Sequence, residues 1–229
     1  MDQVTPHDTL LIVDVQRDFL PGGALPVKEG DAVVPVLNHC IDRFSAAGRP
    51  VFATRDWHPP DHCSFQPQGG PWPVHCVAHT EGAAFAPDLR LPADAVIVSK
   101  GTARDREAYS GFEGTDLEEQ LRRHHTQRLW VGGLATDYCV LNTVRDALER
   151  GFEVLVLTDA IRAVDRRTGR RPARLRNDAP TRGAVWVMGG WGLGVGGWDL
   201  GGEAFRGCRD CRDYRGCRDC RGYRVAAFS

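Results

Sequence analysis

Short apolar segments typical of buried strands alternate with helical patterns along the first two-thirds of this 229-residue chain. The strand-like segments lie near residues 9–14, 50–54, 95–99, 128–133 and 153–158. The helical patterns, in which apolar residues recur every three or four positions, lie near residues 31–47, 116–125 and 137–150. Strands that alternate with helices pair in parallel, so this order predicts an α/β fold: a mainly parallel sheet covered by helices on both faces, in three layers.

Cys139 carries the clearest chemical signal, because it lies where a strand is predicted to end and a helix to begin. It closes the octet GGLATDYC at residues 132–139, which follows the apolar residues 129–131. The unpaired N–H groups and the dipole at a helix start favour a thiolate, which predicts a nucleophilic cysteine. The octet alone does not separate this interpretation from a buried cysteine that packs as a small apolar residue.

Asp14 and Lys100 each follow a predicted strand. Asp14 ends the apolar residues 10–13, and Lys100 ends residues 95–99. Lys100 is one of only two lysines among 29 basic residues, so its choice over arginine suggests a chemical role. Taken singly, each residue would be interpreted as solvated. In a parallel sheet, however, the carboxyl ends of the strands meet at the edge where open α/β folds build their sites.

Together with Cys139, these two residues predict an acyl-transfer site. Asp14 would take the thiol proton and return it to the leaving group, while Lys100 would hold the Asp14 carboxylate and stabilise the thiolate. The backbone N–H groups of Ala135 and Cys139 would form an oxyanion hole, in which one donor lowers the barrier by ~3 kcal/mol.

A fourth segment predicts a metal site. Asp56 and His58 are two positions apart, so both project to one side of an extended strand end, and His62 and His75 lie in the following loop. A carboxylate with two or three imidazoles suits zinc, iron(II) or manganese and leaves positions open for water and substrate. Half-exposed histidines among turn-forming prolines are the alternative, but four candidate ligands within twenty residues argue against it.

The chain resembles the nicotinamidase (pyrazinamidase) branch of the isochorismatase-like cysteine hydrolase family. The matching segments are 14–19 (DVQRDF), 56–58 (DWH), 72–77 (WPVHCV), 100–102 (KGT), 109–114 (YSGFEG), 133–139 (GLATDYC) and 158–160 (TDA). They occur in the family's order over residues 8 to 165. The cysteine segment marks the superfamily, whereas the DWH and WPVHCV segments narrow the resemblance to the metal-containing branch.

The resemblance implies the isochorismatase-like hydrolase fold, a divalent metal cofactor, and hydrolysis of nicotinamide to nicotinate and ammonia through a Cys139 thioester, with pyrazinamide as a further candidate substrate. It implies a triad of Asp14, Lys100 and Cys139, and a cis peptide bond before Ala135. The implied metal ligands are Asp56, His58 and His75, with His62 at a position that ligates in some members. The residues implied to pack the pyridine ring are Phe19, Trp72 and Tyr109.

The composition of the chain limits where the enzyme can work and which partners it can have. The net charge is −1, and no apolar run reaches the ~20 residues needed to cross a membrane. Residues 1–8 are polar and acidic, unlike a secretory signal. We therefore expect a cytoplasmic enzyme, monomeric or homo-oligomeric, with a reduced cysteine, a small-molecule substrate and no nucleic-acid or membrane partner.

The character of the chain changes after residue 165, which predicts a hydrolase domain over 1–165 and an atypical tail over 166–229. The tail holds 14 arginines, no lysine and six acidic residues. The resemblance implies a helix and a last strand here, but only residues 184–188 (AVWVM) have a strand-like pattern. The tail ends in a nine-residue repeat, GCRDCRDYR then GCRDCRGYR, over residues 207–224.

Three interpretations of the tail remain open. Its two Cys-x-x-Cys pairs formally suit zinc, and its arginines and tyrosines suit nucleic acid. An altered reading frame after about residue 165 would also explain the abrupt change in charge. The corresponding alternatives for function are a related cysteine hydrolase that acts on another small amide or on isochorismate, and an inactive scaffold with an aberrant C-terminus.

Overall fold

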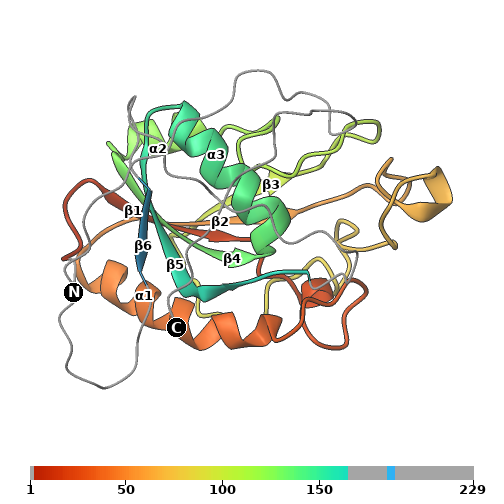
Figure 1. Cartoon of the computed structure of the whole chain (residues 1–229), viewed down its shortest axis with the longest axis horizontal. Coiled ribbons are helices and arrows are strands. Elements are labelled where there is room, and N and C mark those ends of the chain that lie inside the picture. The colour runs from red at the N-terminus through yellow and green to blue at the C-terminus, as the bar shows by residue number, and fades with distance from the viewer. Residues whose placement is uncertain (1–2, 165–184, 189–229) are drawn as a thin grey trace.

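The computed structural model describes residues 3–164 and 185–188 (Figure 1). Its strands are β1 (Asp8–Val13), β2 (Val51–Asp56), β3 (Val96–Lys100), β4 (Arg128–Leu134), β5 (Glu153–Arg162) and β6 (Val185–Met188). Its α-helices are α1 (Val33–Ala46), α2 (Leu117–Arg123) and α3 (Leu141–Glu149). Shorter turns are the 3₁₀-helices Arg17–Phe19, Gly30–Ala32 and Gln66–Gln68, and the π-helix Thr136–Val140. None of the described helices is long and apolar enough to span a membrane.

The six strands form one sheet in the order β3-β2-β1-β4-β5-β6, and every neighbouring pair is parallel. The chain builds outward from β1 through β2 to β3, then crosses to β4 on the other side of β1. The carboxyl ends of β1 and β4 therefore flank the point where the strand order reverses, where α/β sheets place their ligand sites.

Helices cover both faces of the sheet, as the alternation predicted. Figure 1 shows α1 along one face and α2 with α3 on the opposite face. Strand β1 divides its side chains between the two layers: Leu10 and Ile12 pack in the cluster that contains α1, and Leu11 and Val13 pack in the cluster beneath α2 and α3. All four are fully buried, so β1 lies at the centre of the molecule.

Strand β6 occupies the strand-like segment of the tail. It pairs with β5 from Val154 opposite Val185 to Leu157 opposite Met188, so the sheet has a sixth strand at this edge. The boundary expected at residue 165 thus falls between two strands of one sheet. The helix implied before this strand and the cysteine-rich repeat lie outside the described residues.

Gly133 brings β1 and β4 unusually close where the site begins. Its φ angle is +132°, and a Cβ atom built on it would lie 2.0 Å from the carbonyl oxygen of Val13. The pairing register of β4 with β5 also shifts between Val131 and Gly133, as at a β-bulge. Only glycine fits this position without displacing the neighbouring strand.

Candidate active site

Four parallel strands deliver charged or nucleophilic side chains to one edge of the sheet. Asp14 directly follows β1, Asp56 ends β2, Lys100 ends β3, and Cys139 lies in the π-helical turn between β4 and α3. All four residues are buried. The structure therefore brings together the three residues of the predicted triad and adds Asp56 to them.

Lys100 is the centre of this cluster. Its Nζ atom lies 2.5 Å from Asp56 Oδ1, 3.0 Å from Asp14 Oδ2 and 3.4 Å from Cys139 Sγ. It also donates a hydrogen bond to the Ala108 carbonyl at 3.1 Å. Burial disfavours the charged ammonium, but the two carboxylates outweigh it and raise the pKa of Lys100 well above its ordinary value. The lysine therefore stays charged.

Asp14 is held in an uncommon backbone conformation beside the cysteine. Its φ angle is +50°, in the left-handed region that non-glycine residues rarely adopt outside functional sites. Thr54 Oγ1 donates a hydrogen bond to Asp14 Oδ1 at 2.7 Å, which leaves Oδ2 facing Lys100. Burial raises the pKa of Asp14, Lys100 opposes this shift, and the charge of Asp56 adds to it, so that the net shift is upward. A raised pKa suits a group that must accept and return a proton.

The surroundings of Cys139 raise the pKa of its thiol. Burial raises its pKa well above the ordinary value, and Asp14 and Asp56 add to this effect while Lys100 opposes it. Because burial and the two carboxylates together outweigh Lys100, the reaction needs a base to remove the thiol proton.

The backbone around the cysteine has the special geometry that the resemblance implied. The peptide bond between Leu134 and Ala135 is cis. The Ala135 carbonyl accepts hydrogen bonds from the N–H groups of Tyr138 and Val140, each at 3.1 Å, which fixes the turn. Ala135 and Cys139, the two residues predicted to form the oxyanion hole, both line the pocket.

Asp56, His58 and His75 form a cluster whose ligand atoms all lie within 4.8 Å of one another. The Nδ1 atom of His58 bonds the Gly101 carbonyl at 2.9 Å, and that of His75 bonds the Pro73 carbonyl at 2.7 Å. Each imidazole therefore presents Nε2 to the cluster. A backbone carbonyl on the outer nitrogen is the usual support for a metal-binding histidine. One carboxylate and two such histidines fit a divalent transition metal with open positions.

His62 lies beside this cluster and not in it. Its Nδ1 atom bonds Ser64 Oγ at 2.7 Å, and its Nε2 atom bonds the Arg106 carbonyl at 3.0 Å. The ring stacks on His58 with centroids 4.2 Å apart. Because both ring nitrogens have hydrogen-bond partners, His62 offers no free ligand atom in this arrangement, unlike the three residues of the cluster.

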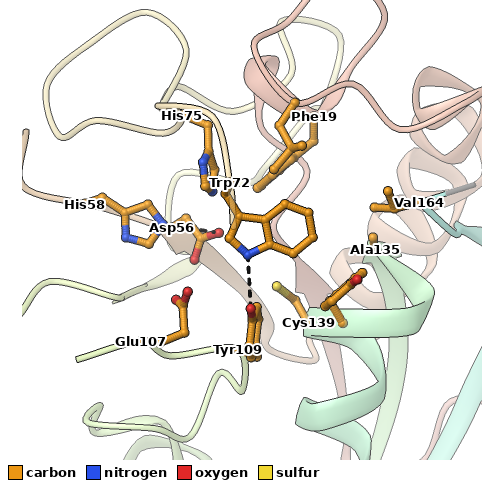
Figure 2. Close-up of a pocket in the computed structure, with 12 residues that line it drawn as sticks. Phe19, Asp56, His58, Trp72, His75, Glu107, Tyr109, Ala135, Cys139 and Val164 are labelled. Carbon is orange, nitrogen blue, oxygen red and sulfur yellow. Dashed lines mark hydrogen bonds and ion pairs between the residues drawn. The ribbon is translucent and has the colours of Figure 1, made fainter. Parts of the chain in front are cut away.

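One pocket is lined both by Cys139 and by the candidate metal ligands Asp56, His58 and His75 (Figure 2). Phe19, Trp72 and Tyr109, the three predicted ring-packing residues, line it. Trp72 Nε1 donates a hydrogen bond to Tyr109 Oη at 3.0 Å, which fixes the two rings relative to each other. The pocket is also lined by four residues that the sequence analysis did not single out: Leu25, Glu107, Tyr138 and Val164.

Gln16 is a supporting residue that the sequence analysis missed. Its buried amide brackets the backbone of Asp56: Nε2 donates to the Asp56 carbonyl and Oε1 accepts from the Asp56 N–H, both at 2.8 Å. The same Nε2 donates to the Ala83 carbonyl at 2.9 Å. The available signal was a polar residue two positions after Asp14, inside a segment that matched the family.

The fold and the site define a cysteine hydrolase of the α/β class, built on a parallel sheet, with a buried cysteine beside a candidate metal centre. The chain belongs to the isochorismatase family: the model of the isochorismatase domain matches residues 8–184. This confirms the family resemblance inferred from the motifs.

Curated relatives and solved structures agree with this assignment. The chain is 42% identical over 181 residues to the nicotinamidase of Escherichia coli K12, covering 70% of this chain and 85% of that protein. It is 40% identical over 158 residues to the nicotinamidase/pyrazinamidase of Mycobacterium tuberculosis, covering 66% and 83%. The crystal structure of Pyrococcus horikoshii pyrazinamidase in complex with zinc superposes with a TM-score of 0.68 at 54% identity, covering 70% and 88%.

Proposed function

We propose that this chain is a metal-dependent nicotinamidase, which hydrolyses nicotinamide to nicotinate and ammonia. One observation carries the proposal: Lys100 joins Asp14, Cys139 and Asp56 in a single buried network, at one end of a pocket whose other side is the Asp56–His58–His75 cluster. The relatives named nicotinamidase at about 40% identity support the choice of substrate.

The chemistry follows from the order of the contacts. Asp14 accepts the Cys139 proton, and the sulfur attacks the amide carbon of the substrate to form a tetrahedral intermediate. The N–H groups of Ala135 and Cys139 stabilise its oxyanion. Asp14 then returns the proton to the nitrogen, ammonia leaves, and a thioester remains. A water molecule, deprotonated by Asp14, hydrolyses the thioester to nicotinate and restores the thiol.

The positive charge of Lys100 offsets the negative charges of the site during this cycle. Before attack its charge faces two carboxylates, and during attack it also faces the developing thiolate at 3.4 Å. Because the site is buried, an ammonium at this distance stabilises the thiolate more strongly than it would in water.

The other side of the pocket suits a flat heteroaromatic ring. Phe19, Trp72 and Tyr109 supply aromatic walls. Asp56, His58 and His75 would hold the metal ion, and we propose zinc because a relative was crystallised with it. When bound, the ion would supply Lewis-acid chemistry toward the ring of the substrate. Pyrazinamide carries the same amide on a similar ring and is a second proposed substrate. A reduced cysteine nucleophile also suits a cytoplasmic setting.

The first experiment is ammonia release from nicotinamide by the purified full-length chain loaded with zinc, with Cys139→Ala as the control. Release that depends on Cys139 supports the proposal. If Cys139→Ala is as active as the parent, the thioester route is wrong. If the folded parent releases ammonia from another small amide but not from nicotinamide, the chain is a related hydrolase. If it releases none from any amide tested, the inactive-scaffold alternative holds.

A further inference from the structure

Glu107 is a pocket carboxylate that the proposed mechanism does not use. It lies in the connection between β3 and α2, is half-buried, and lines the pocket on the side of the metal-type cluster. Figure 2 shows its carboxylate pointing toward Asp56 and His58. One oxygen, Oε1, accepts a hydrogen bond from the Ala108 N–H at 3.0 Å.

The backbone on both sides of Glu107 is anchored to residues of the site. The carbonyl of Arg106, just before it, bonds His62 Nε2 at 3.0 Å. The carbonyl of Ala108, just after it, accepts from Lys100 Nζ at 3.1 Å. Glu107 is therefore fixed between two hydrogen bonds, one to a histidine stacked on His58 and one to the buried lysine.

A second loop holds the same segment from outside. The Cys63 N–H donates to the Arg104 carbonyl at 2.8 Å, and Arg104 Nε pairs with Asp61 Oδ2 at 2.7 Å. These contacts dock the segment on the loop that carries His62. The backbone that carries Glu107 is thus held by contacts on both sides, and the Ala108 N–H holds one oxygen of its carboxylate.

Glu107 faces the cluster without belonging to it. The ligand atoms of Asp56, His58 and His75 lie within 4.8 Å of one another, and that set does not include Glu107. A carboxylate that faces a metal centre from beyond ligand distance can accept a hydrogen bond from a water on the ion. Three protein ligands leave room in the coordination shell for such a water.

We propose that Glu107 is a positioning residue of the metal centre, which accepts a hydrogen bond from a water bound to the ion at Asp56, His58 and His75. The proposal rests on the metal site of the proposed function. His62 would then support the metal centre indirectly, because its ring bonds the Arg106 carbonyl and so helps to position Glu107. Outer partners of this kind typically change metal affinity by about 10- to 100-fold.

Zinc affinity tests this proposal without reference to turnover. The full-length protein is stripped of metal, and zinc is titrated in competition with a chromophoric chelator. We expect Glu107→Gln, which keeps the shape but weakens the acceptor, to raise the zinc Kd by about 10- to 100-fold. Asp105→Asn is the matched control: it makes the same chemical change on the same segment, at an exposed position. We expect its Kd to stay within about twofold of the parent, because a distant surface charge is screened.

The outcomes separate this inference from the function on which it rests. A zinc Kd for Glu107→Gln equal to that of the parent overturns the role of Glu107, even if the parent hydrolyses nicotinamide. Equal weakening by Glu107→Gln and Asp105→Asn also overturns it, because the effect would then be one of net charge. Selective weakening by Glu107→Gln in a protein that releases no ammonia supports the inference and contradicts the proposed substrate.

Discussion

Asp56 bonds Lys100 at 2.5 Å through Oδ1 while its other oxygen, Oδ2, lies 3.7 Å from His58 Nε2. One carboxylate therefore belongs both to the metal-type cluster and to the network of the cysteine. The pKa of Asp56 shows the balance: burial raises it, but Lys100 and His58 outweigh burial and hold it well below the ordinary value. The site thus contains two functional halves that share one charged group.

Replacement of Lys100 should damage both halves. In Lys100→Met the two buried carboxylates lose their shared cation, and we expect unfolding free energy to fall by about 3–5 kcal/mol. Turnover should fall by at least about 10²- to 10³-fold, because the thiolate loses its stabilising charge. Urea unfolding and ammonia release measure the two effects. Lys28→Met removes the other lysine of the chain at an exposed position and should change neither. Near-parent stability of Lys100→Met would contradict the shared-cation interpretation.

Asp14→Asn isolates the proton transfer. The substitution keeps the size of the side chain but removes the base, so kcat should fall by about 10²- to 10⁴-fold. Zinc content should not change, because Asp14 is outside the Asp56–His58–His75 set. Steady-state kinetics and metal analysis of the purified variant check both expectations. Asp31→Asn, an exposed counterpart, serves as control. Substantial turnover by Asp14→Asn would assign the base to another group.

His58→Ala and His62→Ala should differ in zinc binding. His58 presents a free Nε2 to the cluster, so its removal should abolish stoichiometric zinc. Both nitrogens of His62 bond Ser64 and Arg106, so its removal should weaken zinc by no more than about 10- to 100-fold, the range for outer partners. Competition titration of the two variants gives the comparison. Equal loss in both would make His62 a ligand.

The ion pair between Asp8 and Arg128 should make the free energy of unfolding depend on pH in the acidic range. Arg128 donates to both oxygens of Asp8, at 2.8 and 2.7 Å, and Thr5 and Trp130 donate to Oδ2 as well. Burial raises the pKa of Asp8, but these bonds outweigh it and leave the pKa below its ordinary value of 3.8. The folded protein therefore binds this proton more weakly than the unfolded chain does. The stabilisation is full above the ordinary pKa and is lost as pH falls through the lower folded pKa.

Asp8→Asn tests this pair. At neutral pH we expect a loss of about 3 kcal/mol in unfolding free energy, the lower end for breaking a buried pair, because Arg128 is partly exposed. The deficit should shrink as pH falls below 3.8. Urea unfolding at several pH values provides the measurement. A deficit that is constant with pH would show that packing, and not the charge of Asp8, is responsible.

The sequence predicted the arrangement of strand ends better than the partners of side chains. Because parallel strands end at one edge, Asp14, Asp56, Lys100 and Cys139 could be placed together from their positions after apolar segments. Strand position cannot say which atoms meet, so the bond between Lys100 and Asp56 was not predicted. The same limit applies to the pKa of the Cys139 thiol, which burial and two nearby carboxylates raise, because strand position reveals neither.

Contacts between distant segments were the other gap. The sequence placed His62 where some family members have a ligand, but it could not show that the ring bonds Ser64 and a carbonyl 44 residues away. Glu107 carries no motif at all, and only the folded chain places it in the pocket. In the tail, the pattern at 184–188 correctly marked β6, whereas the segments around it had no period from which to predict structure.

Gly133 lets β4 approach β1 closely, just before the chain reaches Asp14 and Cys139. Asp14 and Cys139 leave the sheet from neighbouring strands, and the absent side chain of Gly133 is what allows those strands to meet against Val13. A single methyl group at this position would wedge β4 away from β1 just below both reacting side chains. The proton would then have to cross a wider gap, although the chain would still contain every catalytic residue. The distance of proton transfer therefore depends on the absence of a side chain at Gly133, a residue that takes no part in the chemistry.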